Sequence, residues 1–370
     1  MNIQKKLAKS FQLFQEKKYT EAILILDDIT KVQPDNYDAY SNKAIILISV
    51  GKHKDAIVCF EKALSIKFDK NIANNFVKLL ISLSDWKYAK DINDKLINKF
   101  GELPSFKISS AFILRGEKSY DKAINDFKEL TSIQPNDIDL QMHLGFTLNL
   151  AERYEEAIKL YEKITQHKNR FYPAIYNLAI AQNNAQKYEE AINTFKKSLE
   201  INVNNSNAWL TLAMAQIKSN KFADAKKSIE NILKIKPQDS VDKINYANAK
   251  FLLGVMENTQ NNHKKTIKNL MDVLEIDKNH VEANYHLGLA YLKVKEFTKV
   301  PEYYKYRTIR TVKKYGRYND FEYPKIDLNT QLIVAKEQGI GDELVLIRLL
   351  EKLSEQVKEL VYVCSDKLYK

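Results

Sequence analysis

A short phrase that returns every 34 residues constrains this chain more than any other feature of its sequence. The phrase is clearest in residues 187–195, where Ala191 is followed four positions later by Phe195. Related phrases stand at 18–26, 52–60, 118–127, 153–161 and 221–229. A small residue lets two helices approach closely, and a large apolar residue one turn later fills the space beside it. The constant period therefore predicts a stack of paired helices.

The small residue of each phrase fixes the frame of the repeat. It falls at Ala22, Ala56, Ala89, Ala123, Ala157, Ala191, Ala225, Thr266 and Val300. This pattern resembles the tetratricopeptide repeat, whose unit is a helix–turn–helix pair, over about 300 of the 370 residues. The resemblance implies an all-α, right-handed solenoid over residues 1–310. We expect about nine units, at 3–36, 37–70, 71–103, 104–137, 138–171, 172–205, 206–239, 247–280 and 281–310.

Three units depart from the pattern. The third is one residue short and has Asn93 where an apolar residue is expected. The eighth follows seven extra residues, 240–246, which we expect to lengthen its first helix. The ninth has Val300 and Pro301 in place of the small residue, and Pro301 is predicted to lie in the first turn of a helix. Prolines also end second helices, at Pro34, Pro135 and Pro237.

Composition narrows the class of protein. The net charge is +11, but lysines alternate with acidic residues along most of the chain, which favours solvated helix faces over a nucleic-acid site. The basic and aromatic stretch at 303–325 is the exception, and a single-stranded nucleic acid is its disfavoured alternative partner. No apolar run is long enough to span a membrane, and no signal peptide or disulfide framework is visible. The sequence therefore predicts a cytoplasmic protein, and its Lys, Asn and Ile content indicates an AT-rich bacterial genome.

A concave groove lined by the first helices is the predicted binding surface. The sixth position of each unit should face it, and holds Ala8, Asn42, Phe76, Ser109, His143, Asn177, Thr211, Leu252 and His286. The polar members, Asn42, Ser109, His143, Asn177, Thr211 and His286, are the candidate partner-binding residues. Amide and imidazole groups both donate and accept hydrogen bonds, which suits an extended protein or peptide segment. The ladder is similar, in mixed form, to the asparagine ladder that holds peptide backbone in O-linked N-acetylglucosamine transferases.

Two alternatives stay open for this surface. The sixth position can be a polar face without a ligand. His143 and His286 can be solvated or capping groups, and no Cys/His spacing supports a metal site.

The end of the sequence changes period. Residues 331–336 predict a strand, Gly339 and Gly341 a turn, residues 343–360 a helix and residues 360–364 a second strand. This order is one Rossmann-like βαβ unit, whose strands should be parallel. We therefore expect a connector at 311–329 and the truncated start of an α/β domain at 330–370.

The Glu-Gln-Gly-Ile-Gly-Asp segment at 337–342 resembles the opening of glycosyltransferase domains similar to the heptosyltransferases. Such domains have a two-lobed Rossmann-like (GT-B) fold and often follow tetratricopeptide arrays. The resemblance implies that Asp342 is a general base for an acceptor hydroxyl and that a nucleotide sugar is the donor. It also implies that Gln338, Gly339 and Gly341 form a ligand- or anion-binding turn.

Other interpretations of this segment remain. Asp342 can be the N-cap of a helix. A dinucleotide turn, with Asp366 on the ribose, is disfavoured because Leu344 stands where a third small residue is needed. A second lobe would need roughly 100–200 further residues, so we expect the sequence to be an inactive fragment of a longer enzyme. The alternative is a scaffold without enzymatic activity.

Overall fold

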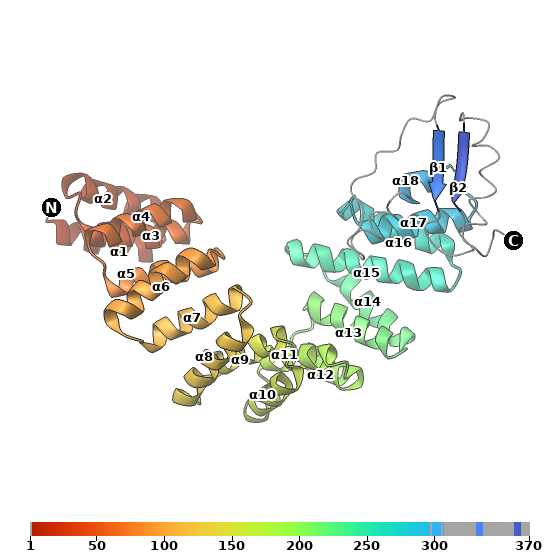
Figure 1. Cartoon of the computed structure of the whole chain (residues 1–370), viewed down its shortest axis with the longest axis horizontal. Coiled ribbons are helices and arrows are strands. Elements are labelled where there is room, and N and C mark those ends of the chain that lie inside the picture. Colours follow the sequence, from red (N-terminus) through yellow and green to blue (C-terminus); the bar gives the residue numbers. More distant parts are fainter. Residues whose placement is uncertain (1, 297, 305, 307–330, 336–358, 364–370) are drawn as a thin grey trace.

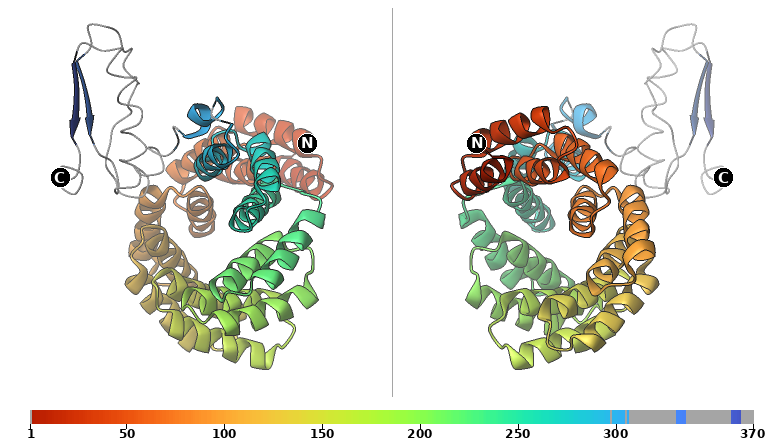
Figure 2. Two further views of the ribbon diagram at one scale, coloured as in Figure 1. Left: turned by 90° about the vertical axis from the view of Figure 1, so that its right-hand side faces the viewer. Right: turned by 90° about the vertical axis from the view of Figure 1, so that its left-hand side faces the viewer.

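The structure is a computed structural model that describes residues 2–296, 298–304, 306, 331–335 and 359–363. Within these residues, antiparallel helix pairs follow one another along a wide arc (Figure 1). Seen at right angles to that view, the pairs trace a nearly closed ring, with the first and last pairs on the same side of it (Figure 2). The arrangement is an all-helical solenoid over the repeat region, as the 34-residue period predicts.

Each predicted unit contains one first helix and one second helix. The first helices are α1 (Ile3–Gln15), α3 (Tyr37–Ser49), α5 (Lys70–Ser82), α7 (Pro104–Gly116), α9 (Ile138–Leu150), α11 (Tyr172–Asn184), α13 (Ser206–Lys218), α15 (Ser240–Thr259) and α17 (Val281–Lys293). The second helices are α2 (Tyr19–Val32), α4 (His53–Ile66), α6 (Trp86–Phe100), α8 (Tyr120–Ile133), α10 (Tyr154–His167), α12 (Tyr188–Ile201), α14 (Phe222–Lys234), α16 (His263–Ile276) and α18 (Val300–Tyr304).

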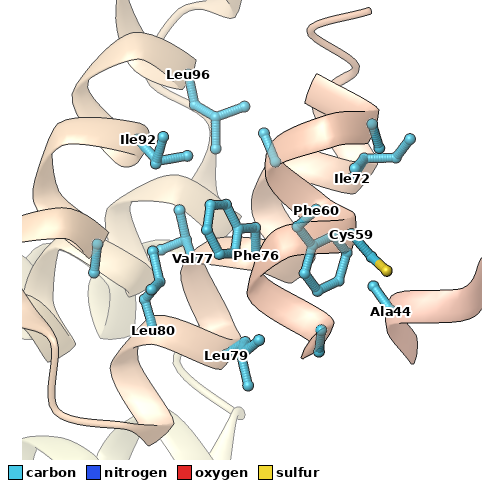
Figure 3. Packing of buried hydrophobic residues seen from close by; sticks show 14 of the residues in the cluster. Ala44, Cys59, Phe60, Ile72, Phe76, Val77, Leu79, Leu80, Ile92 and Leu96 are labelled. Atoms are coloured by element: carbon cyan, nitrogen blue, oxygen red, sulfur yellow. The ribbon is translucent and has the colours of Figure 1, made fainter. Parts of the chain in front are cut away.

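The repeated small residues are the contact points of the helix pairs. All seven frame alanines, Ala22 to Ala225, are fully buried, and the large residues that follow them are buried as well. Figure 3 shows the core between two units, where Phe60 of α4, a large residue that follows a frame alanine, stacks on Phe76 of α5 with ring centroids 5.3 Å apart. In α9 the small residue is Gly145, where an added Cβ would lie 2.6 Å from the ring of Tyr161. The packing rule inferred from the sequence therefore holds in the structure.

The turn between the two helices of a unit has the same geometry throughout the array. Its central residue is left-handed in every unit, with φ near +60° at Lys17, Ser84, Lys118, Glu152, Gln186, Asn220, Asn261 and Lys295 and +75° at Gly51. The amide of the next residue closes the helix end, as where Ser119 donates to the carbonyl of Leu114 at 2.8 Å. The same compact turn therefore sets the angle of each helix pair.

Two departures in the sequence are resolved by the structure. Helix α15 has 20 residues and begins at Ser240, so the extra residues lengthen it as expected. The predicted start of the third unit is wrong by one residue, because α5 begins at Lys70, capped by Asp69. The missing residue is in the turn before α5. The buried Asn93 amide donates to the Phe106 carbonyl at 3.2 Å, which explains a polar residue at an apolar position.

The first helices lie on the inner side of the arc. Consecutive first helices contact one another in several places, as α5 does with α7 and α13 with α15, whereas consecutive second helices make no contact of similar extent among the described residues. Elements on the inside of a curved stack are closer together than those outside. The predicted placement of the first helices on the concave surface therefore agrees with the packing.

Two short strands are described near the C-terminus. β1 (Gln331–Ala335) and β2 (Glu359–Val363) pair in parallel, with Gln331 opposite Glu359. The segment 336–358 between them, predicted as turn and helix, lies outside the described residues. The Rossmann-like unit as a whole therefore stays a prediction. Among the described residues, no helix has the length and apolar character needed to cross a membrane.

Candidate functional site

An apolar column on the first helices is the most continuous feature of the inner surface. The ninth residue of each unit forms it, as Phe11, Ile45, Lys78, Phe112, Phe146, Ile180, Met214, Val255 and Leu289. Lys78 is its single polar member. Phe11, Phe146 and Met214 are 59%, 42% and 48% exposed. Large apolar side chains are exposed elsewhere on the chain too, so it is the alignment of these residues in one column that is informative. Such a column can bind an apolar partner segment.

The polar sixth position runs beside this column. Asn42, His143, Asn177, Thr211 and His286 are partly exposed on first helices. The corrected frame replaces the predicted Phe76, which is fully buried, with the partly exposed Asn75. The polar ladder is therefore more regular than the sequence frame suggested.

Two members of the ladder use their side chains within the fold. Ser109 is only 2% exposed, and its hydroxyl donates to the Ser105 carbonyl, so the prediction that it faces a partner is wrong. Thr211 is partly exposed, and its hydroxyl donates to the Asn207 carbonyl at 2.9 Å. At both positions a carbonyl of the same helix already accepts the hydrogen bond that the hydroxyl group could otherwise donate to a partner.

Asn42 lines a small hollow between α1 and α3. The hollow is bounded by Ser10, Phe11, Phe14, Ile45 and Ile46, so the amide stands among apolar side chains from two units. This arrangement combines an amide for peptide backbone with an apolar recess for one side chain.

Aromatic rings surround Arg115 in the middle of the array. Its guanidinium carbon lies 4.7 Å from the ring centroid of Phe112, 5.3 Å from that of Phe146 and 5.9 Å from that of Phe127. The ring of His143 lies edge-on to Phe112 at 4.7 Å. We call Phe112, Arg115, Phe127, His143 and Phe146 the aromatic–arginine cluster. It joins α7 and α9 on the inner face to the buried core of α8.

The charge of this cluster lacks a counter-ion. Arg115 makes no ion pair in the described part of the chain, and its Nη1 atom is buried without a hydrogen bond. Burial lowers the pKa of Arg115 from its usual value. Burial, and then the nearby Arg115, also lower the pKa of His143, so its ring is neutral at pH 7. The cluster therefore presents one cation in largely apolar surroundings.

Cations elsewhere on the array pair between units. Arg153 Nη1 lies 3.5 Å from Asp121, Lys187 Nζ lies 2.8 Å from Glu155, and Lys221 pairs with Glu189 in the same way. We call these three pairs the ion-pair ladder. Each cation immediately precedes a second helix, and each acid lies in the first turn of the preceding second helix. Acids there also interact favourably with the helix dipole.

The remaining predicted site residues have no structural description. Gln338, Gly339, Gly341 and Asp342 lie outside the described residues, so their roles as turn and base stay predictions. Within the described ranges, His, Cys, Asp and Glu residues form no group that could hold a metal ion.

Sequence reasoning missed the apolar column, Asn75 and Arg115. The column could have been found by aligning the ninth positions, since eight of the nine are apolar. Asn75 could have been identified only if the position of the one-residue deletion in the third unit had been known. Arg115 could be identified only from the three-dimensional structure, because residues that are close in sequence do not show which carboxylates lie near its guanidinium in space.

Comparison with known families identifies the repeat. Residues 37–70, 114–182 and 184–244 match models of the tetratricopeptide repeat. The chain therefore contains tetratricopeptide repeats in these ranges. No curated protein matches the sequence.

Solved structures with similar folds are distant. A tetratricopeptide repeat protein from Parabacteroides merdae is 17% identical over 78% of this chain and 98% of its own, with a TM-score of 0.46. The C-terminal part of a TPR repeat-containing protein from Cytophaga hutchinsonii is 17% identical over 76% and 99%, with a TM-score of 0.42. A human IFIT1 dimer with m7Gppp-AAAA is 15% identical over 82% and 80%, with a TM-score of 0.48. All three scores are below 0.5, so these structures say nothing about the partner of this chain.

Proposed function

Taking its tetratricopeptide repeats as the premise, we propose that this chain is a scaffold whose inner face binds an extended segment of a partner protein. The observation that carries the proposal is the apolar column with its exposed Phe11, Phe146 and Met214. Beside it runs the polar sixth-position ladder, including Asn42 and Asn177. Apolar side chains of the segment bind the column, and its backbone pairs with the amides.

Selection of random linear peptides displayed on phage tests this function. Peptides should be enriched on the immobilised protein, and the enrichment should be lost in the double variant Phe146→Asp, Met214→Asp. Leu24 on α2 is 59% exposed on a second helix, so Leu24→Asp is the matched control and should leave enrichment unchanged. Equal enrichment on both variants would place binding elsewhere.

We also propose, as a second function, that the C-terminal segment belongs to a heptosyltransferase-like glycosyltransferase that uses a nucleotide sugar. The support is the parallel pairing of β1 with β2, because parallel strands need a crossover connection such as a helix. In this proposal the array docks acceptor proteins, Gln338, Gly339 and Gly341 form the turn, and Asp342 is the base.

A protein that carries this segment together with a second lobe would test the assignment. Loss of a general base lowers the rate by about 10²–10⁴-fold, so Asp342→Ala should lower sugar transfer by that factor. The neighbouring Glu337→Ala is the control. Unchanged transfer in Asp342→Ala would remove Asp342 from the chemistry.

A further inference from the structure

The aromatic–arginine cluster holds a cation that the fold itself does not neutralise. Arg115 has three rings around its guanidinium, its side chain is half-buried, and one terminal nitrogen is covered without a hydrogen bond. A planar guanidinium carries five donors in a fixed fork. The covered nitrogen has no acceptor within the described fold, which leaves the charge without a partner and is costly. An acceptor that reaches the accessible part of the half-buried guanidinium from outside would gain both charge neutralisation and hydrogen bonds.

The cluster lies on the face proposed to bind a partner. Arg115 is on the first helix α7, three residues after the column residue Phe112, and it touches the column residue Phe146 of α9. Phe146 keeps 42% of its surface exposed, so the ligand side of the cluster is open. An anionic group that reaches Arg115 must therefore have apolar neighbours that cover Phe112 and Phe146.

Charge selects the class of ligand. The neighbouring His143 is neutral at pH 7, and the whole chain carries a net charge of +11. Attraction over the whole molecule thus favours an acidic partner. A carboxylate matches the fork of an arginine with two parallel hydrogen bonds, and an extended peptide can supply one between apolar side chains.

We propose that Arg115 binds the carboxylate of an Asp or Glu side chain in an extended partner peptide, whose adjacent apolar residues cover Phe112 and Phe146. This inference rests on the proposed function and names the chemistry of its ligand. Because Arg115 lies in the middle of the array, its ion pair would fix the position of the peptide along the apolar column.

The test begins with peptides selected on the full chain. A selected peptide is synthesised with an amidated C-terminus, so that its side chains are the sole source of carboxylates. Its affinity is measured by fluorescence anisotropy for the original protein and for Arg115→Met. The same measurements are made with a peptide in which the Asp or Glu shared by the selected peptides is changed to Asn or Gln. Arg115→Lys and Arg153→Met provide the matched protein controls.

The expected result is a coupled loss. Removing Arg115, or changing the acid to its amide, should each weaken binding at least about tenfold, and doing both should cost no more than either alone. Arg115→Lys should be intermediate, because it keeps the charge but loses the fork. Arg153→Met should bind like the original protein, since Arg153 belongs to the ion-pair ladder. Changing the peptide leaves the protein's fold untouched, so a loss with the amide peptide cannot come from misfolding.

The results that would overturn the proposal fall into two groups, which are distinguishable. Peptides that bind the inner face with additive losses, with no acid among the selected residues, or only with a free C-terminus would refute the role of Arg115 and leave the proposed function intact. Absence of any selected peptide would refute both.

Discussion

The ion-pair ladder and the aromatic–arginine cluster both contain an arginine, but within the described part of the chain the arginine has carboxylate partners only in the ladder. Arg153, in the turn between α9 and α10, donates from Nε to Glu156 at 2.6 Å and lies 3.5 Å from Asp121 of the preceding unit. Arg115, on the inner face, is surrounded by rings and has no carboxylate beside it in the described residues. One arginine links units of the solenoid, and the other keeps its hydrogen-bonding capacity for something outside the fold.

The difference shows how a repeat protein divides its surfaces. Residues that return with the period, such as the ladder acids and cations, join each unit to the next. Residues that interrupt the period, such as Arg115, are not needed by every unit and are free to serve a ligand. If this division is right, the largest loss of stability should come from a change at the helix contact that supports the cluster.

The close packing of α9 against α10, which holds the aromatic–arginine cluster in place, should be sensitive to added volume. Gly145 lies between His143 and Phe146, and a Cβ there would meet the ring of Tyr161 at 2.6 Å. Gly145→Ala should therefore lower the free energy of unfolding by about 1–3 kcal/mol, measured by urea denaturation. Tyr161→Leu in the same chain should recover part of that loss. A Gly145→Ala variant as stable as the original protein would show that α9 and α10 are not packed this closely.

The two arginines should differ in what they contribute to stability. Arg153→Met should lower the free energy of unfolding by up to about 1 kcal/mol, because the ion pairs that it removes are largely open to solvent. Arg115→Met should leave it unchanged or raise it, since methionine keeps the contact with the rings and removes a cation without a counter-ion. A larger loss of stability in Arg115→Met than in Arg153→Met would show that the fold itself depends on the Arg115 cation.

The pH dependence of stability should report the charge beside His143. Burial and the nearby Arg115 hold the folded-state pKa of His143 below the usual value of 6.5, so the unfolded chain binds the proton more readily. Stability is then lost as the pH falls through about 6.5 and levels off below the folded-state pKa. Chemical denaturation between pH 7.5 and 5 should show a smaller loss of stability in His143→Gln than in the original protein.

In the Arg115→Met background this loss should also shrink, because Arg115 is one cause of the lowered pKa of His143. An unchanged pH profile in both His143→Gln and Arg115→Met would separate the histidine from the cluster.

The smallest effect is expected in the turn that joins α7 to α8. Lys118 is left-handed there, with φ of 61°, a conformation that costs a residue with a Cβ more than glycine. Lys118→Gly should raise the free energy of unfolding by a few tenths of a kcal/mol, up to about 1. The converse change at the same position of the second unit, Gly51→Lys, should lower it by a similar amount. Thermal denaturation of both variants measures the pair.

The sequence was sufficient for the fold of the repeat region, because the packing of Ala22, Ala157 and their equivalents depends on local spacing. The one-residue deletion before α5 misplaced the third unit, since both Lys70 and Asn71 are compatible with a helix start. For the groove, the sequence could predict which helix face lines it but not which side chains are available to a partner. Which side chains remain available on it, as Ser109 and Arg115 show, depends on partners from other turns and other units.

The most direct measurement of the central claim is photo-crosslinking of a selected peptide. A benzoylphenylalanine is placed at Met214 on the first helix α13 or at Leu24 on the second helix α2, both of which are well exposed. Crosslinked products are then located by mass spectrometry. If the inner face binds the partner, the peptide crosslinks at Met214 and not at Leu24. Crosslinking at Leu24 with none at Met214 would contradict the account.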